Sequence, residues 1–405
     1  MPTTPLVDFS PTLRLLLLAG LVALLPLSWW WLRQRGAPVN RRLAALTALT
    51  VFLTVDLIVF GSFTRLTDSG LGCPDWPGCY GEASPLGAQG DIHAAQSAMP
   101  TGPVTVAKAW IEMIHRYLAM TVGALILVAA AISWRARKTL PHSPWWATAT
   151  LVWVIVQGLF GKYTVTLKLY PAVVTLHLLG AMVLLAMLVL QHESFRNRPL
   201  PLRRPLAGAS PAPRWVAATL AVVVMQIALG GWVSTNYAVL ACTGFPACNG
   251  SWWPAMDAGH GFTLLRELGR AGHGGFLPFE ALVAIHMAHR LFAVVAVLAL
   301  AALAGWLWRQ RLPTARRYAW AVIGLMAWQV ASGLSNVVLG WPIVAALAHS
   351  GGAAALVGVL TSLWVRVAAA QPGAVHAAAV DPAAAQASPA QPGAVQAPAA
   401  QPRTA

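Results

Sequence analysis

The chain has 405 residues, of which 58% are hydrophobic and only 10% are charged, and it contains 19 tryptophans. This balance excludes an ordinary soluble domain and is typical of a multi-span membrane protein. The formal charge of +15 does not indicate a nucleic-acid partner, because the basic residues lie in short loops between apolar segments.

Nine apolar segments are long enough to cross a membrane. About 20 residues suffice, and each segment should be helical because lipid offers the backbone no hydrogen-bond partners. The first segment is followed by Arg33 and Arg35 without a small-residue cleavage site, so we expect a retained span. The segments are 13–32, 43–64, 109–133, 145–165, 171–191, 214–234, 281–308, 316–338 and 343–365.

The loops between these segments predict an orientation. Segments 33–42, 135–138, 196–214 and 309–317 are basic, which marks the cytoplasmic side. The long segments 65–108 and 235–280 then face outward, with the N-terminus outside and the C-terminus inside. Residues 367–405 are rich in Ala, Pro and Gln, and we expect a disordered cytoplasmic tail.

All four cysteines lie in the two outward segments, as Cys73/Cys79 and Cys242/Cys248. Each pair has the spacing C-x5-C. On an oxidising face such a pair favours a disulfide over a metal clasp. Two reduced structural thiols are the alternative.

The chain contains an internal repeat. "IEMIHRYLA" matches "IHMAHRLFA", and "CPDWPGC" matches "CTGFPAC". Gln157 precedes His177 by 20 residues, and Gln329 precedes His349 by 20. We therefore expect an all-α integral membrane protein of two tandem, pseudo-symmetric four-helix bundles in a parallel repeat, plus one extra N-terminal helix. The expected parts are 1–42 (extra helix and basic loop), 43–200 (first half), 201–366 (second half) and 367–405 (tail).

Each half carries two histidines at matched depth. His115 and His177 in the first half, and His289 and His349 in the second, lie about six residues or ~9 Å into spans that begin at the outer face. A single such histidine is often an interhelical hydrogen bond. Two pairs in register instead favour bis-axial heme ligation. A copper centre is less favoured, because no Met or Cys lies at matching depth.

An arginine directly follows the first histidine of each pair. Arg116 and Arg290 lie near the outer boundary of their spans. A guanidinium there either binds the propionates of a heme or reaches toward lipid headgroups.

The two halves differ three residues before this histidine. Glu112 lies there in the first half, and His286 takes its place in the second. An acid in lipid is costly and usually functional; the structural alternative is an ion pair with Arg116. The functional interpretation is an acid/base or electrostatic group beside a porphyrin. It predicts a permanent electron-transfer heme in the second half and a porphyrin substrate in the first.

A second difference lies at the end of the first span of each half. Arg65 ends this span in the first half, in "GSFTRLTDSGLGCPDWPGCYG". The sequence comparison sets Thr235 opposite Arg65 in the second half.

These motifs, together with the His177 and His349 spans, resemble the heme A synthase family over residues 43–365. The resemblance implies an eight-helix duplicated bundle that oxidises a methyl group of heme O. The methyl group becomes the formyl group of heme A through a hydroxymethyl stage. Heme A then serves terminal oxidases. The extra N-terminal span and the long tail depart from the family pattern.

The resemblance also implies roles for the matching residues. His115 and His177 would flank the substrate heme iron, with Arg116 and Arg65 close by, and Glu112 would be the essential acid. His289 and His349 would ligate the iron of a resident heme b, with Arg290 and His286 as propionate-binding or supporting residues. Cys73 and Cys79 match an outer-loop cysteine pair of the family.

The expected location is a bacterial inner (plasma) membrane, crossed several times, with the bilayer and heme O as partners. The resemblance allows for a complex with heme O synthase or oxidase assembly factors, and for a homo-oligomer. Two rival functions are a di-heme, bis-histidine cytochrome b electron carrier and a heme carrier or insertion factor. Near-identical halves would favour the electron carrier, whereas the Glu112/His286 difference favours catalysis over both rivals.

Overall fold

The structure is a computed structural model of the chain, and it describes residues 10–140, 142–200, 212–271 and 275–370. The described residues form helices without any strand. The expected tail at 367–405 lies outside the described residues beyond 370, as does the segment 201–211 between the two halves. The all-α integral membrane class is therefore confirmed.

Nine helices of the described chain are longer than 20 residues. They are α1 (Ser10–Arg33), α2 (Val39–Leu66), α4 (Val106–Arg135), α5 (Trp145–Thr166), α6 (Pro171–Arg196), α7 (Ala212–Thr235), α9 (Phe279–Arg309), α10 (Pro313–Val338) and α11 (Ile343–Ala368). Shorter helices are α3 (Gln89–Ala98), η1 (Ala238–Leu240) and α8 (Ala258–Gly261).

Eight of the nine long helices are sufficiently long and apolar to cross a membrane. Helix α5 is the exception among the nine predicted spans, although it has 22 residues. Its sequence contains Trp145, Trp146 and Trp153 together with four threonines. Such amphipathic and polar side chains lower the mean hydropathy of a helix without preventing it from lying among other helices.

Local sequence fixes where the histidine-bearing helices begin. The Thr105 side chain accepts a hydrogen bond from the Lys108 backbone N–H and caps α4. Helix α6 starts at Pro171, a residue favoured in the first turn because it lacks the N–H that would be unsatisfied there. Pro278 and Pro342 directly precede α9 and α11. These starts set how far each histidine lies from the helix end.

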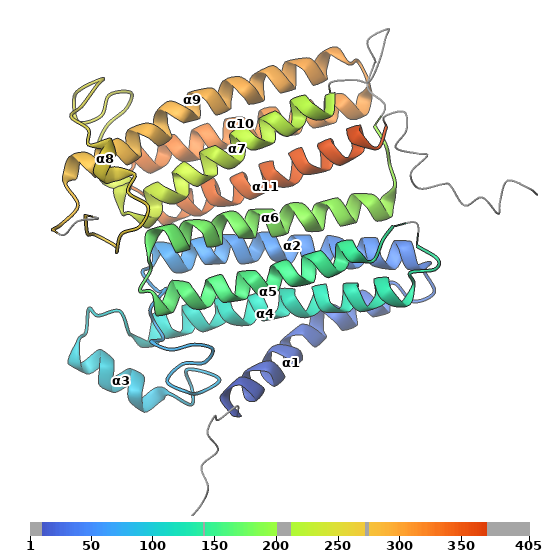
Figure 1. Cartoon of the computed structure of the whole chain (residues 1–405), viewed down its shortest axis with the longest axis horizontal. Coiled ribbons are helices and arrows are strands. Elements are labelled where there is room, and N and C mark those ends of the chain that lie inside the picture. Colours follow the sequence, from blue (N-terminus) through green and yellow to red (C-terminus); the bar gives the residue numbers. More distant parts are fainter. Residues whose placement is uncertain (1–9, 141, 201–211, 272–274, 371–405) are drawn as a thin grey trace, which may run out of the picture.

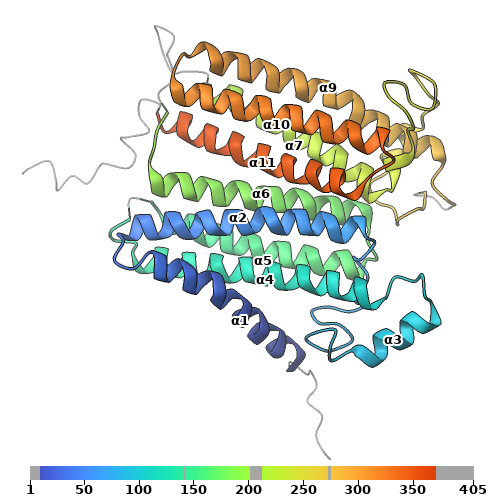
Figure 2. The same cartoon turned by 180° about the vertical axis from the view of Figure 1, so that it is seen from behind.

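The eight helices after α1 contact one another in two rings. In one ring α2, α4, α5 and α6 follow in that order, and in the other α7, α9, α10 and α11 do so. The rings meet where α6 contacts α7 and α11, and where α2 contacts α11 (Figures 1 and 2). We call the end of the molecule formed by segments 67–105 and 236–278 the loop end; α3 and α8 mark it in Figure 1.

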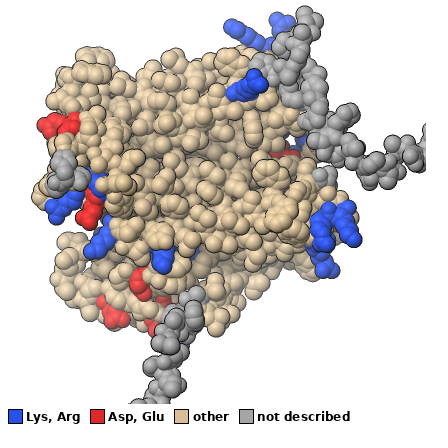
Figure 3. Space-filling model, in the orientation of Figure 1, with Lys and Arg blue, Asp and Glu red and all other residues tan. Residues whose placement is uncertain are grey.

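One apolar core joins the two rings. It includes Met182 of α6, Val216 of α7, Leu303 of α9 and Leu360 of α11, all of them buried. The outside is apolar as well, with Leu25, for example, 75% exposed. Figure 3 shows a broad uncharged band between charged side chains at the two ends. Such a surface is stable in lipid, where no water is available to penalise exposed apolar groups.

The extra helix α1 packs against α4 and α2 (Figure 2). Leu15 is buried in a cluster with Cys73 and Cys79, and Arg14 forms an ion pair with Glu82 at 3.6 Å. The N-terminal half of α1 therefore reaches the loop end beside the first cysteine pair.

Candidate functional site

Each ring places its two histidines on opposite helices. Around the first ring, α4 and α6 lie on a diagonal, and they carry His115 and His177. Around the second, α9 and α11 lie on the equivalent diagonal, with His289 and His349. The imidazoles of each pair lie within electrostatic reach of one another. The structure therefore pairs the four histidines as the sequence repeat suggests.

A glycine on the other diagonal faces each imidazole. A Cβ atom at Gly61 of α2 would lie 3.0 Å from His115 Nε2, and one at Gly161 of α5 would lie 3.7 Å from His177 Cε1. The absence of a side chain at these positions leaves room for the imidazole ring.

The second ring repeats this arrangement. A Cβ atom at Gly230 of α7 would lie 2.9 Å from His289 Cε1, and one at Gly333 of α10 would lie 3.1 Å from His349 Cε1. Gly61 and Gly230 also both precede the first cysteine of their half by 12 residues. By this register Ser234, not Thr235, corresponds to Arg65, so the sequence comparison was one residue out of step.

In the first half, Glu112 connects α4 to the cysteine loop. It is buried, and its Oε2 accepts a hydrogen bond from the Cys73 backbone N–H at 2.8 Å. Its Oε1 pairs with the guanidinium of Arg116, which also donates to the Pro77 and Gly78 carbonyls. The ion pair considered as the structural alternative is thus present, and the carboxylate lies one helical turn from His115.

In the second half, the side chain at the matching position donates a hydrogen bond to its loop instead of accepting one. His286 Nδ1 donates to the Ala238 carbonyl at 2.9 Å. Arg290 donates to the carbonyls of Cys242 at 3.1 Å and Ala247 at 3.4 Å. Arg290 takes part in none of the ion pairs found among the described residues.

Both cysteine pairs form disulfides, Cys73–Cys79 and Cys242–Cys248, as the spacing predicts. The four sulfurs are buried beneath their loops. Each disulfide closes the loop whose carbonyls accept hydrogen bonds from Arg116 or Arg290. The closed loop is therefore held against the helix turn that carries the first histidine of its half.

Arg65 joins the two halves at the loop end. Its guanidinium donates to the Ser234 carbonyl at 2.7 Å and lies 3.9 Å from the centre of the Tyr237 ring. Tyr237 in turn donates to Asp68 at 2.6 Å. Arg65 therefore holds the end of α2 against the end of α7, and in this structure it contacts neither histidine of the first half.

Several buried polar atoms near the histidines have no hydrogen-bond partner among the described residues: His177 Nδ1, Gln226 Oε1, Arg290 Nε and both side-chain polar atoms of Gln157. Burying such groups unpaired is costly, so each suggests an additional partner. Paired imidazoles facing glycines, with an arginine beside them, fit a heme with its propionates. No group of three or more His, Cys, Asp or Glu side chains in the described chain suits a metal ion directly.

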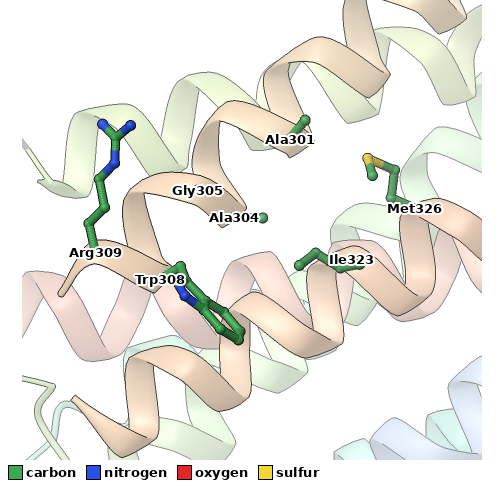
Figure 4. Close-up of a pocket in the computed structure, with 7 residues that line it drawn as sticks. All are labelled: Ala301, Ala304, Gly305, Trp308, Arg309, Ile323 and Met326. Carbon is green, nitrogen blue, oxygen red and sulfur yellow. The ribbon is translucent and has the colours of Figure 1, made fainter. Parts of the chain in front are cut away.

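One surface hollow lies away from the histidines. A groove of about 410 Å³ runs between α9 and α10 and is lined by Ala304, Trp308, Arg309 and Met326, among others (Figure 4). Ala301, the lining residue nearest in sequence to His289, is 12 residues further along α9, or ~18 Å. This groove is therefore separate from the histidine sites.

Several contacting residues were absent from the sequence-based site. Gly61, Gly230, Gln226 and Ser332 all contact one of the four histidines. Their repeat positions relative to the histidines and cysteines could have revealed the two glycines. Gln226 and Ser332 could not have been found that way, because they occur in one half only.

Comparison with known proteins finds a matching family and several similar proteins. The family described as COX15-CtaA, cytochrome oxidase assembly protein, matches residues 44–361. A protein of Shewanella oneidensis named heme A synthase is 37% identical over 327 residues, covering 80% of this chain and 96% of that protein. Similarly named proteins of Caulobacter vibrioides (27% identical; 81% and 96% covered) and Shouchella clausii (30%; 53% and 65%) also match. Helix α1 lies outside the matched residues.

Proposed function

Since the chain belongs to the COX15-CtaA family of cytochrome oxidase assembly proteins, we propose that it is a heme A synthase, an enzyme that converts heme O to heme A. The proposed reaction oxidises one porphyrin methyl group to a hydroxymethyl group and then to a formyl group. Written with water as the oxygen donor, each stage passes two electrons to an external electron acceptor and releases two protons. The rival electron carrier and heme carrier would leave the porphyrin unchanged.

The residues divide between two sites. His115 and His177 would hold the substrate heme O in the first half, on the α4–α6 diagonal. His289 and His349 would ligate a resident heme b in the second half, and Arg290, with its buried unpartnered Nε, would bind a propionate. A bis-histidine heme supplies one-electron transfer when bound. The glycines facing the rings keep side chains out of the space beside the imidazoles.

The difference at the matched helix turn carries this assignment. Glu112 is a buried acid one turn from His115, whereas His286 occupies the position in the second half. The Arg116 guanidinium and the Cys73 N–H hold its two oxygens in place. We propose that Glu112 accepts a proton, or stabilises positive charge, as the neighbouring methyl group is oxidised.

The proposed orientation follows from charge and redox chemistry. The helix ends opposite the loop end carry Arg33, Arg135, Arg309 and other basic residues, which is typical of the cytoplasmic side. The two disulfides at the loop end suit an oxidising compartment. The loop end would then face outward from a bacterial inner membrane.

The substitution Glu112→Gln tests this function. The amide oxygen can still accept from the Cys73 N–H, but the negative charge is lost. We expect heme A to disappear from purified protein while heme b stays at the His289/His349 site. Glu82→Gln is the matched control, because Glu82 forms an exposed pair with Arg14 and should support normal conversion. Normal heme A content in Glu112→Gln would contradict the assignment.

A further inference from the structure

The two histidine sites differ in the polar groups that hold their imidazoles. In the second half, Ser332 Oγ lies 3.0 Å from His349 Nδ1. The Gln226 amide nitrogen lies 3.1 Å from His289 Nδ1 and 3.4 Å from its Nε2, and it donates to the His289 carbonyl at 3.2 Å. Gln329 Nε2 also donates to the His349 carbonyl at 2.9 Å. Each imidazole of this half therefore has a hydrogen-bonding side chain within reach of its Nδ1.

The corresponding positions of the first half are apolar. Gln329 and Gln157 are repeat partners, so Ser332 corresponds to Phe160. Gly230 and Gly61 are likewise partners, so Gln226 corresponds to Leu57. His177 Nδ1 is buried without a hydrogen-bond partner among the described residues.

His115 has a similarly apolar neighbour. Its ring lies parallel to that of Phe60, with the two centroids 6.4 Å apart. Leu57 on α2 offers no counterpart to the amide of Gln226 on α7.

The Ser332 contact also fixes a tautomer. Its hydroxyl group has one proton, which it donates to the Trp328 carbonyl at 2.6 Å. The Oγ lone pairs then accept the Nδ1–H of His349. The proton is thus held on Nδ1, and the lone pair of Nε2 is free for a metal. Such a second partner orients a metal-bound imidazole and raises its basicity.

Gln226 can act on His289 in the same way. Its Oε1 is buried without a partner in the described part of the chain. Rotation of the amide about its last bond brings Oε1, an acceptor, toward the Nδ1–H of a metal-bound His289, and it gives up the hydrogen bond that Nε2 now donates to the His289 carbonyl at 3.2 Å. The acceptor that this imidazole needs is therefore already buried beside it.

We propose that Gln226 and Ser332 are positioning residues that make the second-half site retain its heme, whereas Leu57 and Phe160 leave the first-half imidazoles unfixed for a heme that must enter and leave. This inference rests on the proposed function, which requires one resident and one exchanging heme. It assigns the difference in exchange to two side-chain hydrogen bonds.

The test uses the full-length protein purified in detergent, with Ser332→Ala, Gln226→Leu and Ser332→Thr. For the first two we expect the bound heme b to dissociate about 10–100-fold faster into an excess of heme-binding apoprotein. Its midpoint potential should rise, because a less basic imidazole stabilises the ferric state less, and its low-spin ferric resonance spectrum should shift. Ser332→Thr keeps the hydroxyl and should restore wild-type values.

Ser335→Ala is the matched control. Ser335 lies on the same helix and donates only to the Ala331 carbonyl, so this variant should resemble the wild type in all three readouts. The converse variant, Phe160→Ser, should slow the release of heme from the first half.

Unchanged dissociation, potential and spectrum in Ser332→Ala and Gln226→Leu would overturn the inference, as would equal changes in Ser335→Ala. The proposed function fails separately, if wild-type protein yields heme b at two per chain and neither heme O nor heme A. In that case a shift of the Ser332→Ala potential would still be observed.

Discussion

The helix turn before His115 and the turn before His289 contact their loops through side chains of opposite hydrogen-bonding polarity. Both turns must hold a disulfide-closed loop, and in both an arginine donates to loop carbonyls. In the first half a carboxylate accepts from a backbone N–H, whereas in the second an imidazole donates to a backbone carbonyl. The shared arginine therefore meets a negative partner in one half only.

This difference separates what the repeat needs for binding from what one copy adds. Paired imidazoles, facing glycines, a closed loop and an arginine occur in both halves. The Glu112 carboxylate belongs to the first half, and the Gln226 and Ser332 hydrogen bonds belong to the second. The first half thus has a carboxylate near its histidines, and the second has side-chain hydrogen-bonding groups beside its own.

The largest expected effect comes from filling the space beside an imidazole. Gly333→Leu should displace His349 and lower heme b content about tenfold, because overpacking costs about 1–3 kcal/mol. Gly324→Leu on the same helix meets open space and should leave the heme content unchanged. Heme spectra of the purified proteins measure this.

The same pair of changes can be made in the first half. Gly161→Leu should reduce the binding of heme O and retain heme b, whereas Gly158→Leu one turn away on α5 should do neither. Equal loss of heme b from Gly161→Leu and Gly333→Leu would contradict two separate sites.

Removing each disulfide should give the next largest effect. Cys73→Ser/Cys79→Ser and Cys242→Ser/Cys248→Ser should each lower stability by about 2 kcal/mol, seen in thermal unfolding. Only the first pair should also lower heme A several-fold, because the Cys73 N–H holds Glu112. The comparison would be wrong if the second pair reduced heme A as much while heme b stayed bound.

Arg65→Leu should have a smaller effect. It removes the hydrogen bond to the Ser234 carbonyl and the contact with the Tyr237 ring, which join the halves. We expect a loss of about 1–2 kcal/mol in unfolding free energy. Arg14→Leu, which breaks an exposed ion pair, should change stability by less than about 0.5 kcal/mol. Similar losses in both variants would show that Arg65 does not join the halves.

The smallest expected effect is confined to the loop segment of the second half, residues 236–278. Hydrogen bonds from the His260 backbone and ring lower the pKa of Asp257. Its contribution to stability is therefore present above the unfolded pKa of about 3.9 and is lost as pH falls through the lower folded value. Asp257→Asn keeps the helix cap but should remove this acid-side loss, which unfolding measured between about pH 5 and pH 2 would detect.

Sequence reasoning identified the parts of the site that repeat. The four histidines, both disulfides and the nine long helices follow from periodic patterns that local physics dictates, such as C-x5-C in outward loops and apolar runs between basic ones. Helix α5 shows the limit of hydropathy, since it is a 22-residue helix among the others and contains Gln157 and Lys162, yet it is not among the eight candidate spans.

Contacts between distant segments could not be predicted. The Arg65 guanidinium meets a carbonyl 169 residues away, and Arg116 points into the loop that Cys73 and Cys79 close. Such pairings depend on how helices rotate against one another. Ser332 has no repeat partner of its kind, so no sequence pattern distinguishes it from Ser335, the other serine of α10.

The most direct measurement identifies the hemes extracted from purified wild-type protein and from the His115→Ala and His289→Ala variants, by chromatography and mass. The account predicts heme b together with heme O, its hydroxylated form or heme A in the wild type. His115→Ala should keep heme b and lose the others, and His289→Ala should lose heme b. Heme b alone at two per chain in the wild type would contradict the account.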